Sequence, residues 1–104
     1  MAKTPDRLSG PAQLTGSAAT VYDPPAAGAV MRMIHVSNPS GGAVDFTLSV
    51  GTDAAGTRLF DGYSIPADSV RTFWVDVQLD DADIVQAFAS SAATLVLTIG
   101  GYTL

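Results

Sequence analysis

Residues 44–60 read VDFTLSVGTDAAGTRLF, and this stretch decides the fold class. From residue 44 to residue 50, apolar and polar side chains alternate, which is typical of a strand with one buried and one wet face. Gly51 and Gly56 follow, with Asp53 between them, and these residue types favour a tight turn. The stretch therefore predicts a strand, a turn and the start of a second strand. The expected buried residues are Val44, Phe46, Leu48 and Val50, and the expected wet ones are Asp45, Thr47 and Ser49.

Further short apolar runs lie on both sides of this unit. Turn-forming residues separate them, and a spacing of about 8–12 residues is typical of a β-sandwich or small barrel. No segment keeps a helical period over several turns. We therefore expect an all-β chain that forms a single β-sandwich, Greek-key or jelly-roll-like, with about seven or eight strands. The expected strands are residues 18–22, 29–37, 43–50, 57–63, 69–79, 84–89 and 94–99.

The turn at residues 38–42 reads NPSGG and suggests how two of these strands pair. A short glycine-rich turn between two alternating strands is typical of an antiparallel hairpin. We therefore expect residues 29–37 to pair with residues 43–50. Within residues 29–37, one face is expected to carry Val30, Arg32, Ile34 and Val36, and the other Met31, Met33 and His35.

The strand expected at residues 69–79 alternates without interruption. Phe73, Val75 and Val77 are expected to point inward, which places Trp74 outward. Tyr63 and Trp74 combine a large apolar area with a polar group, so both are candidates for a contact surface. Near the C-terminus, the residues expected inward are Leu95, Leu97 and Ile99.

Residues 1–14 show no clear period and mix charged residues with two prolines. We expect them to form an extended N-terminal arm, with the β-sandwich domain occupying residues 15–104. Two interpretations stay open. The arm is a disordered tail, or it orders against a neighbouring subunit with Leu8 and Leu14 as anchors.

Composition and charge exclude several classes of function. The 104 residues suffice for one domain with a core of its own. The net charge of −5 argues against nucleic acid as a partner, because phosphate binding needs a basic face. No signal-peptide core and no bilayer-spanning apolar run is present, so we expect no membrane partner. The chain has no cysteine, which excludes disulfides and thiol chemistry.

Few residues could carry chemistry. His35 lies in the middle of an expected strand between apolar neighbours, whereas a general base needs an orienting partner. Calcium binds several oxygen ligands, so the weak candidates for a metal site are Asp76, Asp80, Asp81 and Asp83; a solvated turn is the alternative. The sequence contains neither a Gly-x-Ser-x-Gly elbow nor a phosphate-binding glycine loop that ends in lysine. We expect no enzymatic activity and no cofactor.

Three stretches resemble a family of small structural proteins of tailed bacteriophages, especially those with actinobacterial hosts. They are residues 1–14, MAKTPDRLSGPAQL; residues 32–38, RMIHVSN; and residues 51–60, GTDAAGTRLF. The resemblance covers nearly the whole chain. Residues 23–28, DPPAAG, depart from it, since the relatives have a shorter Val-Pro-Ala-Gly turn there.

The resemblance implies a virion component without catalytic residues. The favoured role is a capsid decoration protein on the outer surface of the head, made in the host cytoplasm, which binds the major capsid protein or other virion proteins. A homo-oligomer is expected, with a trimer favoured. The alternative is a tail, neck or fibre-tip component that binds another virion protein or a host-surface receptor or glycan. The candidate partner-binding residues are Lys3, Arg7, Leu8, Leu14, Tyr63 and Trp74.

Overall fold

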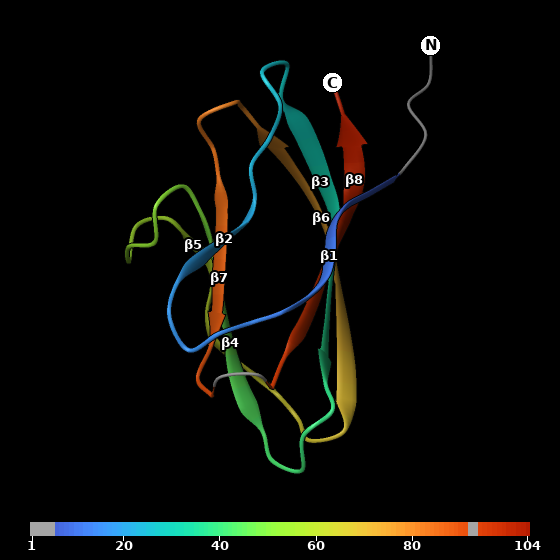
Figure 1. Cartoon of the computed structure of the whole chain (residues 1–104), viewed down its shortest axis with the longest axis vertical. Coiled ribbons are helices and arrows are strands. Elements are labelled where there is room, and N and C mark those ends of the chain that lie inside the picture. Colours follow the sequence, from blue (N-terminus) through green and yellow to red (C-terminus); the bar gives the residue numbers. More distant parts are fainter. Residues whose placement is uncertain (1–5, 92–93) are drawn as a thin grey trace.

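The computed structural model describes residues 6–91 and 94–104, and within them it contains eight strands in two four-stranded antiparallel sheets (Figure 1). The strands are β1 (Asp6–Gln13), β2 (Ala19–Tyr22), β3 (Ala29–Asn38), β4 (Val44–Val50), β5 (Arg58–Ile65), β6 (Ser69–Leu79), β7 (Val85–Ala89) and β8 (Val96–Thr103). The all-β sandwich expected from the sequence is confirmed.

The strand order follows from one simple rule: the first half of the chain pairs with the second half. β1 pairs with β8, β2 with β7, β3 with β6 and β4 with β5. The two sheets therefore have the orders β1-β8-β3-β6 and β2-β7-β4-β5. This is the order of an eight-stranded jelly roll, in which a long antiparallel ribbon is rolled up so that its two halves face each other.

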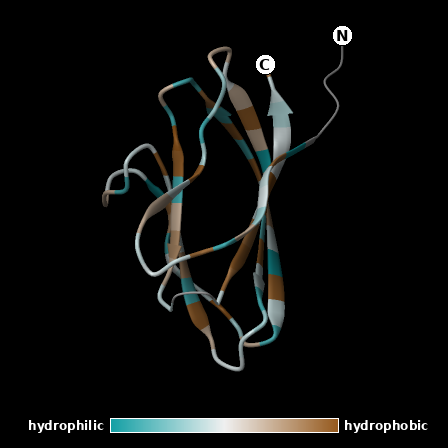
Figure 2. Ribbon diagram, in the orientation of Figure 1, coloured by the Kyte–Doolittle hydropathy of each residue, from teal (hydrophilic) through white to brown (hydrophobic). Residues whose placement is uncertain are grey.

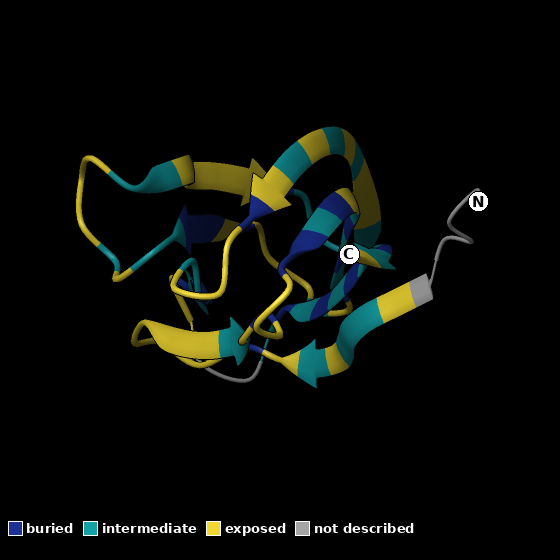
Figure 3. Cartoon of the chain, turned by 90° about the horizontal axis from the view of Figure 1, so that it is seen from above, coloured by how far each residue is buried: buried dark blue, intermediate teal, exposed yellow. Residues whose placement is uncertain are grey.

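The core lies between the inner faces of the two sheets. Hydrophobic residues alternate with polar ones along the strands (Figure 2), and the buried residues gather in the middle of the molecule (Figure 3). Burying one large aliphatic or aromatic side chain stabilises the fold by roughly 1.5–3 kcal/mol. The inward series expected near the C-terminus is confirmed: Leu95, just before β8, and Leu97 and Ile99, within it, are buried in the core.

Strand β6 matches its predicted bounds, and its inner face carries the three residues expected there. Phe73, Val75 and Val77 pack against the core. Trp74, expected outward, is 77% exposed. Uninterrupted alternation in the sequence has therefore placed Phe73, Trp74, Val75 and Val77 on the correct faces.

Of the three residues of β4 expected to be wet, Asp45 is exposed, but Thr47 and Ser49 are both buried. β4 lies inside its sheet, between β7 and β5. The Ser49 hydroxyl donates a hydrogen bond of 2.5 Å to Asp53, which belongs to the connection between β4 and β5. The Thr47 hydroxyl accepts one of 3.1 Å from the N–H of Gly62. The polar face thus bonds with the chain that follows it.

The predicted hairpin between residues 29–37 and 43–50 is wrong. β3 pairs with β6 and β8, whereas β4 belongs to the other sheet and pairs with β5 and β7. The glycine-rich turn is a crossing between sheets, and the buried Asn38 holds it in place. The side-chain Nδ2 of Asn38 donates to the carbonyl oxygens of Gly42, Ile65 and Pro66 at 2.9, 3.0 and 3.1 Å. This amide ties the β3–β4 crossing to the β5–β6 crossing.

The predicted boundary between an arm of residues 1–14 and a sandwich of residues 15–104 is also wrong. Residues 6–13 form β1, which pairs with β8 as an edge strand. Leu14 follows with only 2% exposure, and its N–H donates to the carbonyl of Leu95 at 2.8 Å. Because β8 offers an edge to pair with and the core accepts Leu14, this segment belongs to the domain. Residues 1–5 lie outside the described part of the chain.

The predicted faces of β3 are correct only in its second half. Ile34 and Val36 are buried as expected, but Met31 is buried instead of Val30. The register shifts between Met31 and Met33 in the pairings with both neighbours, β6 and β8. A bulge reverses the alternation of side chains, so a strict period of two fails across it.

We expect Asn38→Ala to lower the free energy of unfolding by about 2–3 kcal/mol, because carbonyl groups at the crossing lose a buried donor. Urea denaturation measures the change. Ser40→Ala is the matched control: Ser40 bonds the same Asn38 side chain but is only partly buried, so its loss is expected to stay below about 1 kcal/mol. Equal costs for the two variants would contradict the bridging role of Asn38.

We expect Leu14→Ala to cost about 2–5 kcal/mol, as for other leucine truncations in a packed core. Leu104→Ala is the control, because Leu104 is 44% exposed at the other end of the chain. Thermal unfolding of both variants checks the assignment. A negligible effect at Leu14 would restore the view of residues 1–14 as a separate arm.

Candidate functional site

A groove of about 520 Å³ lies on the outer face of the β1-β8-β3-β6 sheet. All four strands of that sheet contribute to it: β1, β8, β3 and β6. The lining residues are Arg7, Arg32, Met33, Trp74, Thr98, Gly100 and Gly101.

The floor of the groove exists because two consecutive glycines occupy β8 where β3 bulges. Met33 is paired with Gly100 on one side and with Trp74 on the other. At Gly101, a Cβ atom would come within 1.9 Å of the Val30 carbonyl oxygen, so the close approach of the strands requires glycine there. With Gly100 lacking a side chain, the thioether of Met33 and the indole of Trp74 provide the apolar surface of the groove.

Two arginines line this apolar surface. The Arg32 Nε lies 2.7 Å from an Asp76 carboxylate oxygen, and both side chains remain largely exposed. An exposed pair of this kind contributes at most about 1 kcal/mol to stability, so its main effect is to orient the Arg32 guanidinium. Arg7 lies on β1, paired with Gly100. Two of the five basic residues thus line one groove on a chain with ten acidic residues, which suits an apolar occupant that carries negative charge.

The structure brings Arg7 and Trp74 into the same groove, although they were chosen from the sequence for separate reasons. It does not bring the other candidates there. Leu8 packs against the core and Leu14 is part of it, so neither is available as an anchor for a neighbour. Lys3 lies outside the described residues.

Tyr63, also a candidate contact, lies away from the groove in an aromatic cluster between β5 and β6. Its ring meets that of Phe73 edge-on at 5.1 Å, and Phe73 lies 4.6 Å from Phe60. Tyr63 is still 43% exposed. The side chain therefore belongs to a second surface, at the edge of the sandwich.

Sequence reasoning missed Arg32, Met33, Thr98 and Gly100 as members of a site. The signal available in the sequence was the pair of consecutive glycines, Gly100 and Gly101. Glycines in a strand interior also mark places where backbone or ligand approaches closely. Their position opposite the bulge in β3 depends on strand order, which the sequence did not reveal.

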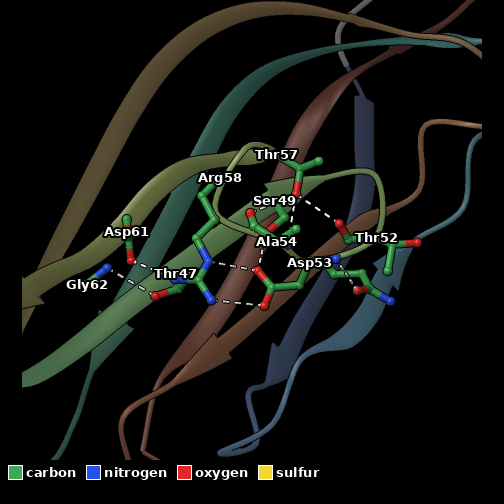
Figure 4. A network of polar contacts seen from close by, with 10 residues as sticks. Thr47, Ser49, Thr52, Asp53, Ala54, Thr57, Arg58, Asp61 and Gly62 are labelled. Atoms are coloured by element: carbon green, nitrogen blue, oxygen red, sulfur yellow. Dashed lines mark hydrogen bonds and ion pairs between the residues drawn. The ribbon is translucent and has the colours of Figure 1, made fainter.

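A polar cluster around Asp53 and Arg58 closes the connection between β4 and β5 (Figure 4). Arg58 donates two hydrogen bonds to the Asp53 carboxylate, at 3.0 and 3.1 Å, and a third to Asp61 at 2.9 Å. These bonds from Arg58, together with the one from Ser49, hold the pKa of Asp53 below its ordinary value of 3.8. The same carboxylate raises the pKa of Arg58. Asp53 therefore stays ionised at neutral pH.

The cluster is a structural support. The N–H of Asp53 donates to Gln86 of β7 at 2.9 Å, and Gln86 in turn donates to Thr20 of β2 at 3.2 Å. Arg58 also lies over the ring of Phe88, 5.6 Å from its centre. One loop is thereby joined to the outer side of three strands, β2, β4 and β7. Residues 51–57 form turns and bends as expected. They also contact the outer side of the β2-β7-β4-β5 sheet, through the bond from Asp53 to Gln86.

The calcium candidates do not form a site. Asp76 pairs with Arg32, and the Asp83 carboxylate accepts a hydrogen bond of 2.9 Å from the N–H of Asp80. Among the described residues, no three acidic or histidine side chains gather as ligands of one metal ion. Residues 80–83 form a turn, which was the alternative to a calcium site.

His35 lies on the outer face of β3 and contacts the next strand. Its Nδ1 lies 2.9 Å from the Thr72 hydroxyl of β6. The two residues are a cross-strand pair. This contact joins two strands and gives the imidazole a partner on the sheet surface, as expected for a histidine on a strand face.

Comparisons with known proteins inform the fold alone. No known protein family matches this sequence, and no curated protein does. Among solved structures, one from a study of Bacillus endospore appendages, described as disulfide-linked pili, is similar. The match covers 97% of this chain and 88% of the other, with 16% identity and a TM-score of 0.57. The described residues contain no helix of the length and hydrophobicity needed to cross a membrane.

We expect Asp53→Asn to destabilise the protein at neutral pH and to matter less in acid. Because folding lowers the pKa of Asp53, its contribution is present above about pH 4 and is lost as the pH falls through the lowered value. Urea unfolding of both proteins across this range measures the difference. Asp61→Asn is the control, since Asp61 is 67% exposed and makes a single bond to Arg58. A difference that does not shrink in acid would contradict the assignment.

Proposed function

We propose that this protein is a structural component of a bacteriophage particle, a decoration protein that binds the outer shell of the head. The observation that carries the proposal is Trp74, an indole that is 77% exposed within a groove and flanked by Met33 and two arginines. Tryptophan and arginine are the residue types most often found at the energetic centre of protein interfaces. The resemblance of residues 1–14, 32–38 and 51–60 to phage structural proteins supports the choice of particle.

The groove suits a segment of a neighbouring shell protein that carries an apolar side chain and a carboxylate. The apolar group would cover Met33 and the indole of Trp74, while the carboxylate would meet Arg7 or Arg32. Covering Trp74 removes a large apolar area from water, which favours association. Charge pairing at the rim speeds the encounter and fixes the orientation more than it adds affinity.

The mechanism is mechanical. A rigid sandwich that contacts two neighbouring shell subunits adds interface area between them, and this area must be lost before the subunits separate. The jelly roll suits this use, because its two sheets share one core and its loops are tied to the strands. A shell decorated in this way resists the outward pressure of the packaged genome better than a bare shell.

One alternative shares the same residue. An exposed indole is also a stacking platform for a sugar ring, so Trp74 is compatible with a tail, neck or fibre-tip component that binds a host glycan. The location on the particle separates the two functions. A decoration protein is present in many copies on the head, whereas a tail component is present in few.

We expect Trp74→Ala to weaken binding to purified undecorated heads by about thirty-fold, the effect of losing a contact worth about 2 kcal/mol. Co-sedimentation with the heads measures the occupancy. Leu59→Ala is the matched control, because Leu59 is 46% exposed on the other sheet. Unchanged head binding combined with lost binding to host cells or glycans would overturn the decoration role in favour of the tail.

A further inference from the structure

The two sheets end on the same side of the molecule, at β6 and β5, and we call this side the β5/β6 flank. β6 closes the order β1-β8-β3-β6, and β5 closes the order β2-β7-β4-β5. The rings of Phe60 and Tyr63 from β5 meet that of Phe73 from β6 across the gap between the sheets, at 4.6 and 5.1 Å. In the described part of the chain, each of these two strands has a paired neighbour on one side only.

Exposed apolar side chains concentrate on this flank. Five large hydrophobic residues are exposed in the described part of the chain, and four of them belong to β5 or β6. These four are Leu59, Tyr63, Val70 and Trp74. The two edge strands of this flank are thus the part of the described chain richest in exposed apolar side chains, and such side chains favour contact with another molecule.

Three of the four sheet edges carry features that discourage pairing with another chain. β1 contains Pro11 and two register shifts, and β2 has only four residues and is followed by two prolines. β5 contains Gly62 at a φ of +67° and pairs irregularly with β4. Proline, bulges and short length are the usual protections of an edge strand.

β6 has the fewest of these protections, a single register shift. It is the longest strand, with 11 residues, and it contains neither proline nor glycine. Its single register shift interrupts the pairing with β3 and leaves the alternation of its own side chains intact. A long, regular edge strand offers a row of backbone donors and acceptors to another strand.

The charge of the flank favours a second copy of this chain as the occupant. β5 carries Arg58 and Asp61, and β6 carries Arg71 and Asp76, so the two strands together have no net charge. The other three basic and eight acidic residues carry the whole net charge of −5. Two copies of an acidic protein repel each other least where they meet through neutral surfaces.

We propose that β6 pairs with β6 of a second copy in antiparallel orientation, so that two copies form a dimer with a two-fold axis. The pairing joins the two β1-β8-β3-β6 sheets into one continuous sheet across the seam. Antiparallel self-pairing is an isologous contact and closes on itself, which gives a dimer rather than an open filament or the trimer expected from the resemblance. The inference concerns self-association and does not rest on the proposed function.

The dimer also places the two candidate grooves on one surface. Trp74 points to the outer face of β6, so both copies of its groove open on the same side of the joined sheet, one on each side of the seam. The aromatic cluster of Phe60, Tyr63 and Phe73 lies between the two sheets of each copy, where β5 faces β6. Pairing therefore covers exposed area on the flank while it leaves the grooves facing outward.

Solution mass tests the association. Sedimentation equilibrium of the full chain is expected to give twice the monomer mass of 10.6 kDa. Val70→Asp places like charges on the edge of β6 and is expected to return the mass to that of the monomer. Leu104→Asp is the control, because Leu104 has similar exposure away from the flank and is expected to stay dimeric. A monomer at all concentrations, or a dimer insensitive to Val70→Asp, would overturn the proposal.

Cysteine crosslinking tests the geometry, and the absence of native cysteine gives a clean background. Single substitutions on the outer face of β6 are oxidised alone and in pairwise mixtures: Val70→Cys, Thr72→Cys, Trp74→Cys and Asp76→Cys. Antiparallel pairing predicts disulfides only between positions whose residue numbers have one constant sum, because only those Cα atoms come close enough. Crosslinks between identical positions at every site would indicate parallel contact, and no crosslinks at all would exclude the pairing; either result would overturn the proposal.

Discussion

The fold depends on the packing of two apolar sheet faces against each other. Neither sheet can bury its inner face alone, so the two sheets share one core. β3 and β4 each lie between two other strands of their sheets, and both contribute buried side chains to this core. Polar side chains are buried in the core only where hydrogen-bond partners are present. Asn38, Thr47 and Ser49 are buried and hydrogen-bonded, and no buried side-chain nitrogen or oxygen of the described residues lacks a partner. Function is thereby left to the outer faces and the edges.

The sequence was a good guide wherever a single strand determined the outcome. β6 alternates without interruption, so its bounds and faces could be predicted, including the outward position of Trp74. The pairing of strands was beyond local reasoning. The turn after β3 has the composition of a hairpin turn, yet Asn38 bonds the carbonyl of Ile65, 27 residues away, and the chain crosses to the other sheet. Turn composition predicts a reversal and says nothing of the sheet that the next strand joins.

The sequence predicted only some of the residues of the candidate groove, and it did not predict the geometry of the groove. Arg7 and Trp74 were recognisable as a charged and an aromatic surface residue. Their meeting requires the order β1-β8-β3-β6, which places four distant segments side by side. Arg32 became part of the site because the bulge between Met31 and Met33 reverses the faces of β3, and the sequence does not mark where a bulge will form. The same reasoning explains why residues 1–14 were misjudged: an edge strand with two bulges and Pro11 loses the alternation by which strands are recognised.

The nested pairing of the chain has a consequence for its synthesis. β8 is made last, yet it lies inside its sheet, between β1 and β3. β1, which is made first, therefore has no neighbour in its sheet until the C-terminal strand has left the ribosome. Folds built from such distant contacts form slowly, on the order of milliseconds to seconds, because the loop must close before the contacts stabilise it. The second sheet and the β3–β6 pair can form without β8, so the last strand completes the first sheet by joining β1 to β3.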